Sequence, residues 1–133
     1  MARPRSTHPT DGELELLNVL WDRGPSTLGE IRERLLEQRE VATTTVATML
    51  KVMREKKLAE RRDSDRGYLW SARVRRDATA GRLLQKLLDG VFDGSPSQLV
   101  SHLLQPGKLD DDERRRIDDL LGRHGIGGRR KKS

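Results

Sequence analysis

The stretch TTTVATMLKVMREKKLAERRDSDRGYLWSA, residues 43–72, decides the fold because the spacing of its apolar residues changes partway along it. Val46, Leu50 and Met53 recur three or four positions apart, which places their side chains on one face of an α-helix. The first half of the stretch is therefore predicted to form a helix over residues 43–57. Its apolar face must be covered by other parts of the chain.

The second half of the stretch, residues 58–72, has the pattern of a β-hairpin. Two short runs flank the polar residues 64–66, and Gly67 closes the turn between them. Tyr68 and Trp70 are two positions apart in the second run, so they share one face of the predicted strand.

Two helix starts precede this stretch. Thr10 with Glu13 and Thr27 with Glu30 follow the capping-box pattern, in which a glutamate comes three residues after a threonine at the helix N-cap. Apolar residues follow each cap at helical spacing, and a Gly-Pro pair separates the two segments. Three short helices followed by a hairpin are the order of elements in a winged helix-turn-helix domain.

Helical spacing returns after residue 75. A helix is expected over residues 78–92, and Ser95 before Pro96 predicts the start of another. Leucines on such helices form an apolar patch typical of an interface if nothing covers them. We therefore expect a helical dimerisation region, with a self-contained subdomain packed on the winged helix as the alternative. The predicted interface residues are Leu84, Leu87, Leu88, Val91, Leu99, Val100, Leu103, Ile117, Leu120 and Leu121.

The composition limits the classes of protein that this chain can belong to. It has 133 residues, a formal net charge of +6 and no cysteine, which excludes disulfides and thiolate chemistry. No apolar run approaches the ~20 residues of a membrane span, and no secretory signal is evident, so a cytoplasmic protein without membrane insertion is expected. The basic balance favours a polyanionic partner, with a solvated arginine-rich surface as the alternative.

The helix predicted over residues 43–57 is the second of the helix-turn-helix pair, the one that enters the major groove of DNA in proteins with this motif. Threonine hydroxyls can reach phosphates or base edges, and threonine methyls can pack on thymine. Basic residues continue into the hairpin, although interleaved acids favour a solvated, salt-bridged face for Lys56 and Arg61. The predicted DNA-binding residues are Thr43, Thr44, Thr45, Thr48, Lys51, Arg54, Arg62 and Arg66.

Catalysis finds little support in the sequence. His8, His102 and His124 are scattered, and no phosphate-binding loop, nucleophile elbow or metal-ligand pair is present. The acidic run at residues 110–113 lacks the spacing of a calcium loop and suits the first turn of a helix. We expect a protein that is not an enzyme and that has no cofactor, catalytic residues or metal site.

These segments divide the chain into four predicted regions. The prediction is a mainly α-helical protein with a small β-hairpin, in which an N-terminal winged helix-turn-helix precedes a C-terminal helical dimerisation region. The regions are a flexible basic arm at 1–9, a winged-helix DNA-binding domain at 10–75, the dimerisation region at 76–123 and a flexible basic tail at 124–133.

Several short motifs, in this order and spacing, make the chain resemble the penicillinase repressor (BlaI/MecI/CopY) family of winged-helix transcriptional regulators over about residues 10–122. The resemblance implies repression of a promoter by a dimer bound to a dyad-symmetric operator. The motifs are ELELL (13–17), VLW (19–21), GPST (24–27), TTVATML (44–50), KKL (56–58), YLWS (68–71) and GSPSQLV (94–100).

The chain departs from the family pattern at three places. Release from DNA in the family often follows cleavage by a membrane sensor-protease, commonly at an Asn-Phe bond, where this chain holds His102-Leu103. The copper-responsive branch carries a cysteine-rich motif that is absent here, which excludes copper sensing by that chemistry. An Arg-Leu pair common late in the recognition helix is replaced by Val52-Met53.

The residues and the resemblance together predict a homodimeric bacterial transcriptional repressor of an operator in double-stranded DNA. It would use recognition helix 43–57 and wing 58–72, and a membrane sensor-protease is the upstream partner that the resemblance implies. Two alternatives stay open: a non-specific architectural DNA-binding protein, and a winged-helix module for protein interaction.

Overall fold

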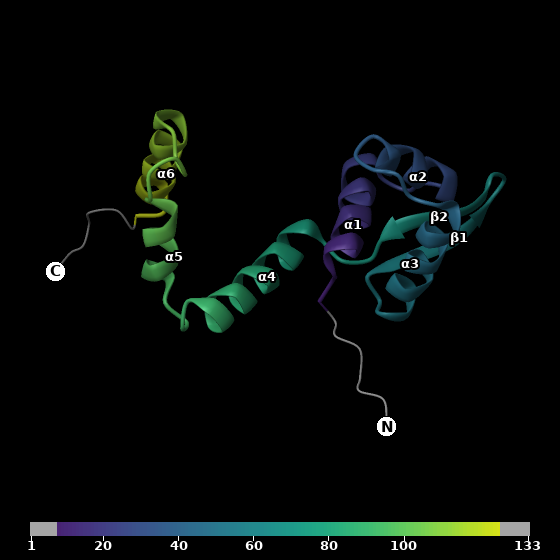
Figure 1. Ribbon diagram of the computed structural model, residues 1–133, viewed down its shortest axis with the longest axis horizontal. Helices are drawn as coiled ribbons and strands as arrows, with labels where there is room; N and C mark the ends of the chain where they lie inside the picture. The colour runs from purple at the N-terminus through teal and green to yellow at the C-terminus, as the bar shows by residue number, and fades with distance from the viewer. Residues whose placement is uncertain (1–7, 126–133) are drawn as a thin grey trace, which may run out of the picture. The chain divides into compact units, whose positions relative to one another are not determined.

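The computed structural model describes residues 8–125, so residues 1–7 of the predicted arm and residues 126–133 of the predicted tail lie outside the described part. The described chain is mainly helical with one β-hairpin, as predicted. It divides into two compact units between Leu83 and Leu84. The elements are α1 (Asp11–Arg23), α2 (Leu28–Leu36), α3 (Thr43–Glu55), β1 (Ala59–Ser64), β2 (Gly67–Ala72), α4 (Arg76–Val91), α5 (Pro96–Leu103) and α6 (Asp111–Arg123) (Figure 1).

Both predicted capping boxes are present at the starts of α1 and α2. The hydroxyl of Thr10 accepts from the Glu13 N–H at 3.2 Å, and the Glu13 carboxylate accepts from the Thr10 N–H at 3.0 Å. Thr27 and Glu30 repeat this exchange at 3.2 and 2.9 Å. Each pair satisfies N–H groups that the helix itself leaves without partners, which fixes where the helix begins.

Helix α3 ends two residues before the predicted limit of residue 57. Its last helical residue is Glu55, Lys56 is the C-cap, and Lys57 has a φ of 65° in the left-handed region. The Leu58 N–H then donates to the Met53 carbonyl at 2.8 Å and turns the chain toward β1. Sequence periodicity missed this end because a lysine, where glycine is usual, takes the left-handed position.

The first unit has one hydrophobic core, formed where α1, α2 and α3 meet the hairpin. Leu16, Ile31 and Leu50 have no exposed area, and Trp70 of β2 is buried among these aliphatic side chains. Trp70 also exchanges two backbone hydrogen bonds with Ser26, at 2.8 and 2.9 Å. The chain just before α2 therefore forms an antiparallel β-bridge with β2 of the hairpin. This pairing holds the wing against the helices.

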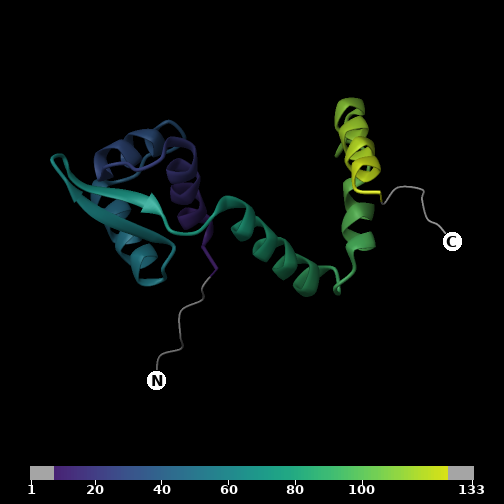
Figure 2. The same ribbon diagram turned by 180° about the vertical axis from the view of Figure 1, so that it is seen from behind.

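Strands β1 and β2 form the predicted antiparallel hairpin, in which Arg61 is paired with Trp70 and Ser64 with Gly67. Gly67 has a φ of 96°, a conformation that suits glycine, and the Ser64 hydroxyl donates to its carbonyl. The turn extends past the helices at the edge of the first unit (Figures 1 and 2).

The second unit contains the end of α4 together with α5 and α6. Leu88 and Phe92 are both buried, and the Phe92 ring lies edge-on to His102 with ring centres 5.0 Å apart. Ser95 caps α5 as predicted, with Pro96 at the first helical position. Neither α5 nor α6 contains a fully buried residue in the described chain, although both helices are amphipathic. None of the helices within residues 8–125 has both the length and the apolar character needed to cross a membrane.

Candidate nucleic-acid interface

The start of α3 differs from the starts of the two helices before it. Its N-cap is Ala42, which provides no side-chain cap, and its first turn contains no acidic residue. The N–H groups of the first turn are therefore left for a partner outside the helix, and a helix N-terminus in this state favours an anion such as a DNA phosphate. Thr43, Thr44 and Thr45 are all exposed around this end.

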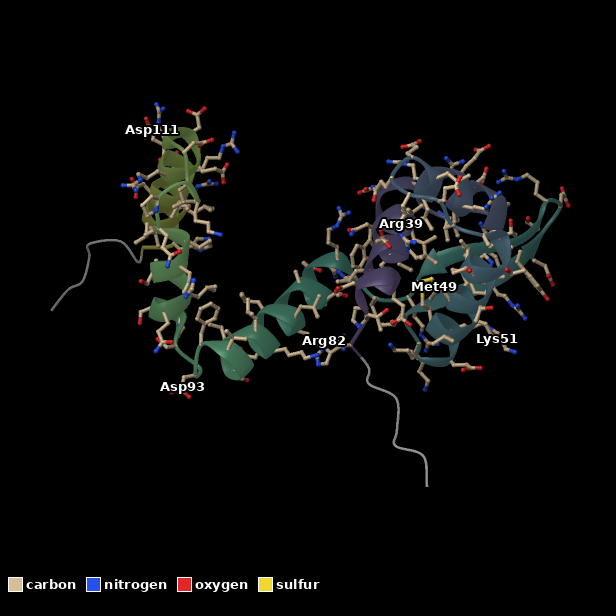
Figure 3. All side chains as sticks on the ribbon, in the orientation of Figure 1. Arg39, Met49, Lys51, Arg82, Asp93 and Asp111 are labelled. Atoms are coloured by element: carbon tan, nitrogen blue, oxygen red, sulfur yellow. The ribbon has the colours of Figure 1, made fainter. Side chains whose placement is uncertain are left out.

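Three of the predicted DNA-binding residues lie on one stripe of α3. Thr44, Thr48 and Lys51 are spaced by four and three positions, and all three are exposed. The stripe lies opposite the face that carries Val46 and Leu50 into the core. Figure 3 shows Lys51 extending from α3 away from the core. We call these three residues the α3 stripe.

The remaining threonines of the predicted set lie elsewhere on the helix. Thr45 is about 100° around α3 from Thr44 and three positions before Thr48, so it borders the stripe on one side. Thr43 is about 100° from Thr44 in the other direction, on the side of α3 that carries Arg54. Thr43 and Thr45 therefore lie on opposite sides of the stripe, about 200° apart around the helix.

The wing carries Arg66 at its turn, and the guanidinium of this residue already forms an ion pair with Glu30. The Arg66 guanidinium lies 3.0 Å from the Glu30 carboxylate, which Arg23 also contacts at 3.0 Å. The pKa of Glu30 is lowered to about 2, most strongly by the hydrogen bond from the Thr27 N–H and further by the hydrogen bonds from Arg66 and Arg23. Glu30 therefore stays ionised. A DNA phosphate would have to compete with Glu30 for Arg66.

Arg61 has a position in the structure that sequence reasoning missed. Its guanidinium lies over the Tyr68 ring, 3.9 Å from the ring centre, and 5.6 Å from the Trp70 ring centre. Because side chains alternate along a strand, the predicted DNA-binding residue Arg62 points to the opposite face of β1. The signal for Arg61 was present in the hairpin register, which places it across from Trp70.

The side chains of α3 and the hairpin surround an open cavity of about 480 Å³, which we call the basic hollow. Two predicted DNA-binding residues of α3 and one of the wing line it, together with Arg61. The lining residues are Leu28, Ala47, Leu50, Lys51, Arg54, Arg61, Arg66, Tyr68 and Trp70.

Lys56 is removed from any DNA surface by a buried ion pair. Its ammonium lies 2.7 Å from a Glu13 carboxylate oxygen, and the two side chains are only 7% and 6% exposed. The ammonium also donates to the His8 carbonyl at 3.1 Å. The pair fixes the C-terminal end of α3 to the first turn of α1, and so helps to set the position of the α3 stripe.

The predicted interface residues of the second unit differ in exposure. Leu88 is 8% exposed and is therefore covered by its own chain, while Leu99 and Ile117 are half-buried. Leu84, Leu87 and Val91 share one face of α4 by their spacing. The exposed members of the predicted set are Leu84, Leu87, Val91, Val100, Leu103, Leu120 and Leu121.

A helix-turn-helix packed on a hairpin, with an exposed polar stripe on its last helix and arginines in its wing, defines a winged-helix DNA-binding protein. The penicillinase repressor family matches residues 9–123 of the chain. The chain therefore belongs to the penicillinase repressor family, whose members are transcriptional repressors and not enzymes.

Two relatives illustrate how far this similarity extends. The penicillinase repressor of Staphylococcus aureus is 21% identical over 109 residues, which cover 82% of this chain and 86% of that protein. The transcriptional regulator BlaI of Mycobacterium tuberculosis is 29% identical over 120 residues, covering 86% and 87%.

Solved structures of two regulators also align with most of the chain. The reduced form of MarR from E. coli is 19% identical, with a TM-score of 0.47, over 86% of this chain and 76% of that one. The transcriptional regulator Tm0710 from Thermotoga maritima is 18% identical, with a TM-score of 0.47, over 88% and 75%.

Proposed function

We propose that the protein is a homodimeric repressor that reads a dyad-symmetric operator, with one α3 in the major groove of each half-site. The observation that carries this proposal is the α3 stripe on the second helix of a helix-turn-helix, beside a helix start that lacks both a cap and an acid. A helix with these features can place short polar side chains on base edges while its N–H groups meet the backbone.

The proposal assigns different tasks to the side chains of the site. Thr44 and Thr48 contact base edges, since they are the short polar side chains of the exposed stripe. Thr43 and Thr45 lie in the first turn of α3, on opposite sides of the stripe, and contact phosphates. The basic residues Lys51, Arg54, Arg62 and Arg66 contact phosphates, which gives affinity and salt dependence without sequence preference.

The exposed apolar residues of the second unit support the homodimer. Full burial of a leucine or valine side chain contributes about 1.5–3 kcal/mol, and Leu84, Leu87 and Val91 are all more than 40% exposed in one chain. Helices α5 and α6 add four further exposed residues of the predicted interface. A second copy of the same unit would cover these surfaces and place two α3 helices on one duplex.

The cellular setting follows from the proposed role. A repressor acts on chromosomal DNA, so we place this one in the cytoplasm of a bacterium. The membrane sensor-protease implied by the family stays a prediction, and the bond that corresponds to its target lies at the end of α5, between His102 and Leu103.

Selection of bound duplexes from a random pool tests this proposal. A repressor of the proposed kind enriches a palindrome whose half-sites are about one helical turn, ~34 Å, or a multiple apart. It then prefers that site over unrelated duplex by about 10³-fold or more. Binding without enrichment would instead identify an architectural DNA-binding protein. No binding at low salt, with the dimer intact, would identify a protein-interaction module.

A further inference from the structure

The basic hollow combines features of a small-molecule site with a strong bias of charge. Its volume of about 480 Å³ lies within the ~300–1,000 Å³ typical of ligand pockets. Four of the lining side chains are cationic, two are aromatic and three are aliphatic, and no acidic residue of the described chain lines it. Such a hollow favours a ligand that has both an aromatic ring and a negative charge.

We propose that the basic hollow binds a small aromatic carboxylate, and that the bound ligand excludes DNA from α3 and the wing. The first part concerns an activity beyond DNA recognition. The second part rests on the proposed function, because it requires Lys51 and Arg54 to contact DNA phosphates. Together they describe an inducer that releases the operator without cleavage of the chain.

Arg61 is the residue best placed to hold the carboxylate. Its guanidinium is stacked on Tyr68 and lies near Trp70, so its orientation is set while its N–H edge is left to meet a planar carboxylate. Lys51 and Arg54 supply charge from α3 on the other side of the hollow. Arg66 contributes less, because its guanidinium is already paired with Glu30.

The apolar lining favours an aromatic acid over a DNA phosphate as the occupant. A phosphodiester would match the cations but would leave the accessible apolar part of the lining, formed by Tyr68, Leu28 and Ala47, without an apolar partner. Bases within a duplex stay stacked, so they cannot fill this space. The ring of an aromatic acid covers the apolar lining while its carboxylate meets the arginines.

The ligand site can be tested on the full chain without DNA, with 2-naphthoate as the probe. Trp70 lines the hollow and Trp21 does not. The indole N–H signal of Trp70 in an NMR spectrum, distinguished from that of Trp21 with the variant Trp21→Phe, should therefore shift saturably as naphthoate is added. Cyclohexanecarboxylate, neutral 2-naphthalenemethanol and inorganic phosphate each lack one of the required features and should bind at least about tenfold more weakly.

A pair of adjacent variants separates a specific site from general charge attraction. Arg61→Ala should weaken naphthoate binding about tenfold or more, as expected for loss of a charge-assisted hydrogen bond. Arg62→Ala removes the same charge from the other face of β1 and should leave naphthoate binding unchanged. Lys51→Gln, at an exposed helical position, should weaken binding too and provides a second test if Arg61→Ala does not fold.

Three outcomes would overturn the ligand site: no saturable shift of the Trp70 signal, equal losses in Arg61→Ala and Arg62→Ala, or phosphate binding as tightly as naphthoate. A competition with duplex tests the second part. If naphthoate binds but leaves bound duplex in place, exclusion of DNA is wrong. If the chain binds no duplex at all, the proposed function fails while the result of the naphthoate titration still stands.

Discussion

Replacement of Lys56 by methionine tests how the position of α3 is stabilised. The change keeps most of the side-chain volume but leaves the Glu13 carboxylate, 6% exposed, without the ammonium that lies 2.7 Å away. Removing one partner of a buried ion pair costs about 3–5 kcal/mol. Glu13 keeps its hydrogen bond from the Thr10 N–H and its favourable place in the first turn of α1, which offsets about 1 kcal/mol. We therefore expect a loss of about 2–4 kcal/mol in the free energy of unfolding.

The tryptophans make this prediction measurable for the first unit alone. Trp21 and Trp70 both lie in that unit, so their fluorescence during urea unfolding reports on it at a fixed chain concentration. Glu13→Gln should also destabilise the unit, and the double variant should lose less than the sum of the two single changes. Arg39→Met, which breaks the more exposed pair between Arg39 and Glu15, should have a much smaller effect and serves as the control.

The reasoning would be refuted by either of two results. A loss below about 1 kcal/mol for Lys56→Met would show that the buried carboxylate tolerates isolation. Additive losses in the double variant would show that Glu13 and Lys56 act through separate contacts and not as a pair.

Three further predictions concern the interface, acid stability and assembly. Arg66→Ala should weaken binding to all duplexes alike and should reduce the salt dependence of the DNA-binding constant, the slope of log K against log salt, by about one. Thr44→Ala should instead change the sequence preference, and fluorescence anisotropy measures both effects. An unchanged slope in Arg66→Ala would exclude Arg66 from the interface. The lowered pKa of Glu30, about 2 against an ordinary 4.5, means that its stabilisation is complete above about pH 4.5 and is lost as the pH falls to about 2. The stability advantage of the natural chain over Glu30→Gln in urea unfolding should therefore narrow across that window, and a constant difference would contradict this. Leu87→Glu should shift sedimentation toward single chains, and an unchanged dimer would remove α4 from the interface.

Local signals in the sequence were enough to predict most of the first unit. The two capping boxes and the turn before Gly67 involve residues within three positions of each other, so their hydrogen bonds follow from short-range patterns. The β-bridge between Ser26 and Trp70 could not be predicted in this way, because these residues are far apart in the sequence and only the folded core brings them together. The end of α3 was missed for a local reason, the left-handed Lys57.

The sequence predicts which helix and hairpin form the candidate site better than it predicts the contacts of the individual side chains. Helical spacing places Thr44, Thr48 and Lys51 on one exposed stripe, and this part needed no tertiary information. The pairing of Arg66 with Glu30 and the packing of Arg61 on Tyr68 depend on how the hairpin lies against α2 and on its register. Charge patterns alone cannot show which basic side chains are already engaged.

Sedimentation equilibrium, on the chain alone and on its selected duplex, tests most directly whether two second units join to present two α3 helices to DNA. The free chain should sediment with twice the single-chain mass of 15.2 kDa, and each duplex should carry two chains. A free chain at the single-chain mass, with one chain on each duplex, would contradict the proposed dimer and its symmetric operator.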